Sequence, residues 1–174
     1  MNTRSAIALV VFGLFLTQCT AVSPSQCNRL RPSPRVAAIL AWPDEGGSVY
    51  YQAKRTDGFD YRTNLAKAAV GEESALSKLF VYTRTNHLMG EGSESHIEVL
   101  GELLKQWGDL DYAKILQLES TTVIREVAVQ LDEFWGHPGW PKAKYPVTER
   151  LCAQTAKAEQ PADGKTPEAP QALH

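Results

Sequence analysis

The chain has 174 residues, with 18 lysines and arginines against 20 aspartates and glutamates, for a net charge of −2. At roughly 100–200 residues per domain, this length indicates one domain, and a hydrophobic content of 43% excludes a wholly disordered chain. The near-neutral charge excludes an ordinary basic nucleic-acid binder, so we expect no nucleic-acid partner.

The first residues predict an export signal. Residues 6–16 form an uninterrupted apolar run behind Arg4. The run is too short for a membrane-spanning helix, which needs about 20 apolar residues, and it has the proportions of a signal-peptide core. We therefore expect residues 1–18 to be a signal peptide and the mature protein to act in the cell envelope, in the periplasm.

The residues after this run resemble the lipobox of bacterial lipoproteins. Leu16 stands three residues before Cys19, as it does before the lipidated cysteine of that family, although Gln18 replaces the usual small residue. The resemblance implies that Cys19 becomes the first mature residue and anchors the protein to a membrane by lipid. Ordinary signal-peptide cleavage after Ala21 is the alternative.

Two cysteines remain after either route of processing. An oxidising compartment favours a disulfide between Cys27 and Cys152. By chain-entropy reasoning, a loop of that length makes the bond worth about 4–5 kcal/mol. Two unpaired thiols near the ends of the domain are the alternative.

Composition sets the predicted domain boundaries. Residues 19–35 are interpreted as a tether because the segment 28–35 is basic and interrupted by prolines. Residues 153–174 contain few residues that could be buried, so we expect a disordered tail. The interval 36–152 is then the helical domain.

The first part of this domain, residues 36–58, has two interpretations. An apolar segment over 36–42 and an alternating segment over 48–54, separated by a turn, predict a small β-hairpin in 36–54. A pair of helices explains the same residues. We favour helices because an isolated hairpin is only marginally stable.

Two amphipathic helices are predicted further along the chain. The first begins at Ser95, where Ser95 and Glu98 form a capping-box pattern, and ends at Gly108. The second begins after Ser120 and ends at Gly136. Their predicted buried faces contain Ile97, Leu100, Gly101, Leu104 and Trp107 in the first, and Ile124, Val127, Ala128, Leu131 and Trp135 in the second. Shorter helices over 73–88 and 109–118 alternate with them, and this alternation suggests stacked αα-hairpins.

Residues 108–136 resemble one repeat of the HEAT family. The second helix of such a repeat has the pattern seen here at Ile124, Arg125, Ala128 and Leu131, and residues 71–107 resemble a weaker copy. The resemblance implies an all-α fold, a short right-handed stack of αα-hairpins that binds other proteins. It assigns no catalytic residue, and Arg125 would bond to turn groups of a neighbouring repeat.

One loop contains residue types that could hold a metal. His87, Glu91, Glu94 and His96 are close in sequence, and imidazoles with carboxylates bind zinc. Their spacing matches no closed metal motif, and no hydrolase, P-loop or dinucleotide motif is present. We therefore expect no metal, no cofactor and no catalytic residue. A metal-binding or hydrolytic enzyme that uses the His87–His96 loop is the alternative.

Two features suggest a protein partner. Trp140 lies in a Pro- and Gly-rich turn, and tryptophan is frequent at binding hot spots. Residues 91–133 contain ten acids against three bases, among them Glu98 and Glu102, which could attract a basic partner. A tryptophan that covers the helical stack and a solvated acidic face are the structural alternatives. We predict a non-catalytic envelope lipoprotein, of the immunity, inhibitor or envelope-accessory type, that binds another, unidentified protein.

Overall fold

The computed structural model describes residues 30–136 and 142–158. Within these residues the chain forms eight α-helices, one short 3-10 helix and no strand, so the predicted all-α class is confirmed. The predicted signal peptide, Cys19, Cys27 and Trp140 lie outside the described residues. The helices in chain order are α1 (Pro34–Leu40), α2 (Val49–Asp57), α3 (Tyr61–Ala69), α4 (Glu73–Thr85), α5 (Glu91–Trp107), α6 (Asp109–Leu116), α7 (Thr121–Trp135), η2 (Lys142–Lys144) and α8 (Pro146–Ala158).

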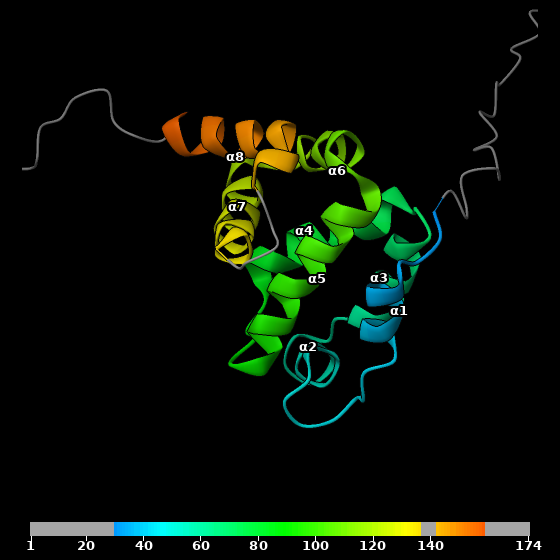
Figure 1. The fold of residues 1–174 in the computed structure, drawn as a ribbon. Helices are drawn as coiled ribbons and strands as arrows, with labels where there is room; N and C mark the ends of the chain where they lie inside the picture. Colours follow the sequence, from blue (N-terminus) through cyan, green and yellow to red (C-terminus); the bar gives the residue numbers. More distant parts are fainter. Residues whose placement is uncertain (1–29, 137–141, 159–174) are drawn as a thin grey trace, which may run out of the picture.

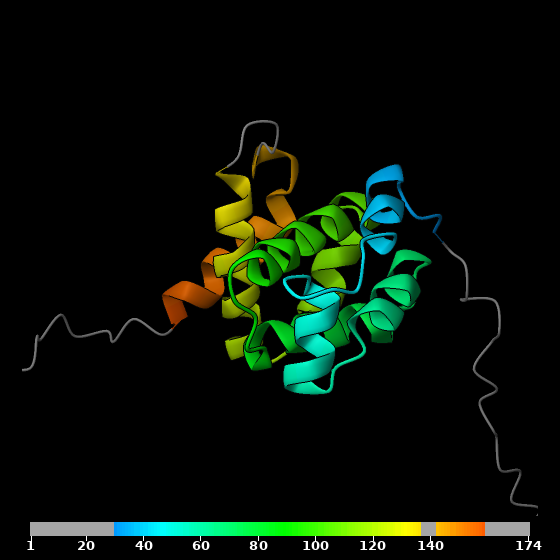
Figure 2. The same ribbon diagram turned by 90° about the horizontal axis from the view of Figure 1, so that it is seen from below.

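Helix α5 crosses the middle of the domain (Figure 1). It packs against α1 and α2 and also against α6 and α7, while α4 contacts α3, α6 and α7. Helix α8 packs on α6 and α7. Seen from below, α1–α3 lie on the opposite side of α5 from α7 and α8 (Figure 2). The core therefore forms around α4 and α5, where Tyr61, Phe80, Leu100, Leu104 and Tyr112 are fully buried.

Residues 36–40 belong to α1 and residues 49–54 to α2, with a connection between them that contains no strand, so the β-hairpin interpretation is wrong. The Ser33 hydroxyl accepts a hydrogen bond from the backbone N–H of Val36 and caps α1. In the same way, Ser48 accepts from the N–H of Tyr51 and caps α2. These side chains satisfy backbone donors that a helix start leaves unpaired, which favours helix over strand.

The predicted start of α5 at Ser95 is wrong. The helix begins at Glu91, one turn earlier, and Ser95 is buried within it. Gly90 has a φ of +50°, a backbone conformation that suits glycine and separates the loop from the helix. Glu91 and Glu94 then occupy the first turn, where their charges complement the helix dipole.

The folded domain is longer at both ends than the predicted interval 36–152. Its first helix begins at Pro34, and the N–H of Leu30 already donates to the carbonyl of Val70 at 3.2 Å. Helix α8 continues to Ala158, through residues assigned to the tail. Over residues 146–156, its buried side chains recur at helical spacing, but two of the three are threonines: Thr148, Cys152 and Thr155.

The stack of αα-hairpins is not confirmed. In such a stack, α6 and α7 would pack against each other as one hairpin. Instead, α6 packs mainly on α8 and α5, and α7 packs mainly on α4, α5 and α8. Helix α7 itself agrees with the prediction, because Ser120 caps its start, Gly136 ends it, and Ile124, Val127 and Leu131 are buried.

Candidate functional site

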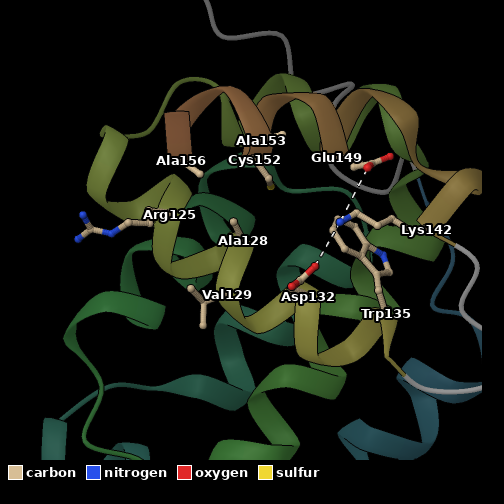
Figure 3. A pocket seen from close by; sticks show the side chains of 10 residues that line it. All are labelled: Arg125, Ala128, Val129, Asp132, Trp135, Lys142, Glu149, Cys152, Ala153 and Ala156. Carbon is tan, nitrogen blue, oxygen red and sulfur yellow. Dashed lines mark hydrogen bonds and ion pairs between the residues drawn. The ribbon is translucent and has the colours of Figure 1, made fainter. Parts of the chain in front are cut away.

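A groove of about 230 Å³ lies between α7 and α8. Small and apolar side chains form its walls, with Ala128 and Val129 from α7 and Cys152, Ala153 and Ala156 from α8 (Figure 3). Val129 is 56% exposed, so its side chain is accessible to a partner from solvent. The groove is smaller than the roughly 300–1,000 Å³ typical of small-molecule sites. Its size therefore suits side chains of a partner better than a cofactor.

Charged side chains surround one end of the groove. The Lys142 ammonium lies 3.2 Å from an Asp132 carboxylate oxygen and 3.8 Å from one of Glu149, so it links α7 to α8. The same ammonium is 5.1 Å from the centre of the Trp135 ring. At the other end, Arg125 points away from the groove (Figure 3). The apolar walls are thus bounded by charges at both ends, a pattern found in protein interfaces.

Helix α8 is positioned by a carboxylate from a distant part of the sequence. Both oxygens of Asp109, the first residue of α6, accept backbone N–H bonds at 2.8 Å, one from Val147 and one from Thr148. These donors belong to the first turn of α8, where a negative charge is favoured. Asp109 therefore fixes the α8 wall of the groove against α6.

The cysteine in the groove is unreactive. Cys152 forms no disulfide with another described residue, and it is only 6% exposed. Burial raises the pKa of the Cys152 thiol to about 11, so it is protonated near neutral pH and is a poor nucleophile. Its predicted partner Cys27 lies outside the described residues, and the disulfide stays a prediction.

A second hollow, of about 330 Å³, lies at the turn between α2 and α3. Two of its charged side chains, Arg62 and Asp60, bond within the protein. Arg62 donates to the carbonyls of Leu40 and Trp42, and its guanidinium lies 3.9 Å from the centre of the Tyr50 ring. Asp60 accepts from the N–H of Thr63 as the cap of α3. These contacts explain the hollow as a structural feature of the turn.

His96 is a core residue and not a partner of His87. It is 1% exposed, and its ring accepts from the Tyr61 hydroxyl at Nδ1, 2.6 Å away. The Thr83 hydroxyl donates to the Leu79 carbonyl, so the contact of 2.9 Å between Thr83 and Nε2 has the ring as donor. Burial lowers the pKa of His96 to about 3, and the ring is neutral.

The structure does not assemble the metal site considered for the His87–His96 loop. His87 is exposed and bonds to Asp57, whereas both ring nitrogens of His96 are occupied inside the core. Across residues 30–136 and 142–158, no group of three or more histidines, cysteines and carboxylates could hold a metal ion. None of the helices described is long and apolar enough to cross a membrane.

The two glutamates predicted to bind a partner are both engaged within the chain. Glu98 pairs with Arg35 of α1. Glu102 is only 8% exposed and pairs with Lys105 at 2.8 Å. The sequence placed Glu102 on the outer face of its helix, but in the structure it is buried. The sequence does not predict the groove, because α8 has no apolar repeat and the carboxylate that caps it, Asp109, is far away in sequence.

No known protein family, curated protein or solved structure matches this chain.

Proposed function

We propose that the chain is an exported envelope protein that binds another protein through the α7–α8 groove and does so without catalysis. The observation that carries the proposal is the groove, with its exposed Val129 and its walls of small side chains. A small apolar cleft bounded by charges is the usual form of a site that accepts a few side chains of a partner.

The charge on α7 indicates the chemistry of the partner. This helix contains Glu126, Asp132 and Glu133 against the single base Arg125. Asp132 is 72% exposed although it contacts Lys142. The groove itself is lined by two bases, Arg125 and Lys142, and two acids, Asp132 and Glu149, and the negative excess comes from Glu126 and Glu133 elsewhere on α7. A segment with apolar side chains that enter the groove, flanked by lysine or arginine, complements this negative excess. We therefore propose a basic amphipathic segment of another protein as the occupant.

Export and lipid attachment complete the proposal. The support comes from the apolar run over residues 6–16 and the lipobox-like position of Cys19. A Cys19→Ser variant should lose its association with membranes if the cysteine is lipidated. Identical fractionation of this variant and the wild type would contradict lipidation and would leave the groove proposal untouched.

The groove is tested by affinity capture from the envelope with two matched variants. Val129→Arg places a charge in the groove, at an exposed position where it should not disturb folding. Ala38→Arg places the same charge on the exposed side of α1, which packs mainly on α3 and α5.

We expect a protein captured by the wild type to be lost with Val129→Arg and retained with Ala38→Arg. A thermal melt confirms that both variants are folded. Equal capture by all three chains would contradict the groove as the binding site.

A further inference from the structure

The loop between α4 and α5 exposes two metal-ligating side chains, one residue apart. The His87 side chain is 74% exposed and Met89 is 77% exposed. Leu88, between them, is half-buried and packs against the core. Because the middle residue turns inward, the imidazole and the thioether both face solvent on the outside of the loop.

The ring of His87 is held in one orientation by a buried carboxylate. Asp57, the last residue of α2, has a side chain that is 8% exposed. One of its oxygens lies 2.6 Å from Nδ1 of His87, and the other accepts from the backbone N–H of His87 at 3.2 Å. That second oxygen also accepts from the Tyr82 hydroxyl at 2.6 Å. Asp57 therefore fixes both the ring and the backbone of His87.

This arrangement determines which nitrogen is available. One oxygen of Asp57 accepts from both the Tyr82 hydroxyl and the His87 backbone N–H, and the other faces Nδ1 of the His87 ring. An ionised carboxylate only accepts, so Nδ1 carries the proton and the lone pair of the neutral ring is on Nε2. Imidazoles that bind metals have the same arrangement, with the second nitrogen donating to a carboxylate.

Met89 is fixed by another side chain of α2. Its N–H donates to the Gln52 side-chain oxygen at 2.9 Å, and the Gln52 amide donates to the Met89 carbonyl at 3.1 Å. The same amide also bonds to the carbonyl of Gly47 at 2.8 Å. The backbone on both sides of Leu88 is therefore hydrogen-bonded to side chains of α2, while the large apolar side chain of Met89 is exposed to water. Exposing such a side chain forgoes about 1.5–3 kcal/mol of burial.

We infer that His87 Nε2 and Met89 Sδ form a binding site for a soft monovalent metal ion of the Cu(I) class. A thioether is a soft ligand that favours Cu(I), and imidazole binds copper as well. Harder ions such as Mg²⁺ and Ca²⁺ require several oxygen ligands. Asp57 is a positioning residue for the imidazole. The site is on the α4–α5 loop and does not depend on the α7–α8 groove.

The probe is Ag⁺, a soft monovalent ion like Cu(I). Unlike Cu(I), it is not oxidised by air to a divalent ion during the titration. Met1 and Met89 are the two methionines of the sequence, so a methyl-labelled methionine sample gives a simple carbon NMR spectrum. Met89→Leu identifies the signal. The titration continues to an excess of Ag⁺ over all thiols, because the cysteines also bind silver but do not move the Met89 methyl.

We expect Ag⁺ to shift the Met89 methyl signal, and Zn²⁺ to leave it in place because zinc prefers nitrogen, thiolate and carboxylate ligands. His87→Ala should weaken the Ag⁺ response at least about tenfold, and Asp57→Asn by about 10–100-fold, as expected for loss of an orienting carboxylate. His174→Ala is the matched control and should leave the response unchanged.

An unmoved Met89 signal would overturn the site, as would a response that is the same in His87→Ala. A response to Zn²⁺ as strong as that to Ag⁺ would overturn the assignment to a soft ion. Unchanged affinity in Asp57→Asn would remove the positioning role. The exposed position of His87 means that its alanine variant should fold, and a thermal melt of each variant verifies this.

Discussion

Replacing His96 with glutamine should remove a specific pH dependence from the stability of the domain. His96 is buried among uncharged groups, with Tyr61 at one nitrogen, Thr83 at the other and the Tyr82 ring beside it. Burial lowers its pKa to about 3, whereas the same ring in the unfolded chain has a pKa of about 6.5. Below about pH 6.5 the unfolded chain therefore binds a proton that the folded chain does not.

The sign and size of the effect follow from this difference. Stability rises with pH wherever the unfolded state binds more protons, so the wild type loses stability as the pH falls from about 6.5 toward 3. Each pH unit in this window costs about 1.4 kcal/mol, which amounts to about 2.5 kcal/mol between pH 7 and pH 4.5. The folded state also lowers the pKa of Asp57 and of Asp60. The stability that these two carboxylates contribute is lost at lower pH, as the pH falls through their pKa values.

Urea denaturation at several pH values between 7 and 4.5 measures the effect, with the free energy of unfolding extrapolated to water for each chain. The wild type should lose about 2.5 kcal/mol more than His96→Gln over this range. The variant is expected to be less stable at pH 7, because the network around His96 is disturbed, so the slopes and not the absolute values are compared. Parallel curves for the two chains would refute the assignment of a buried neutral histidine.

Three further substitutions test the packing and the hydrogen bonds of the domain by the same denaturation assay. Gly101→Ala should destabilise by about 1–3 kcal/mol, because a Cβ there would overlap the Phe134 ring, and adding Phe134→Leu should recover part of the loss. Full stability of the single variant would contradict this packing. Tyr112→Phe should be neutral or stabilising, since its buried hydroxyl has no hydrogen-bond partner among the described residues, whereas Tyr61→Phe should cost about 1 kcal/mol. Equal losses would count against the assigned networks. Asp109→Ala should cost about 1–3 kcal/mol and speed hydrogen exchange at Val147 and Thr148, with a smaller loss for Asp109→Asn. Unchanged exchange at these two amides would show that the carboxylate does not hold α8.

The sequence predicted the helices whose apolar residues and caps agree with each other. Helix α7 is the clearest example, because Ser120, the apolar spacing and Gly136 all indicate the same bounds. Helix α8 is not predicted in full by the sequence, for two physical reasons. Its buried face contains Thr148 and Thr155, which resemble surface residues in a hydrophobicity pattern. The carboxylate that caps it, Asp109, lies 38 residues earlier in the chain.

The candidate sites are formed by tertiary contacts between residues that are far apart in the sequence, and a local sequence pattern does not predict such contacts. The groove has one wall from α8, so it could not be predicted without that helix. His87 and His96 were grouped because they are close in sequence, but a helical turn of α5 carries His96 into the core beside Tyr61. The role of Asp57 in orienting His87 joins residues 30 positions apart. The sequence gives no sign that Met89 is exposed, because methionine is usually a buried residue.

The central claim, that a partner protein binds in the α7–α8 groove, is tested most directly by site-specific photocross-linking in the intact envelope. A photoreactive amino acid replaces Val129 in one chain and Ala38, on α1, in the control. If a partner binds in the groove, position 129 should give one discrete cross-linked protein and position 38 none. The cross-link should be lost when Ala128 is also changed to a bulky residue that fills the groove. Equal cross-linking from both positions, or none from position 129, would contradict binding in the groove.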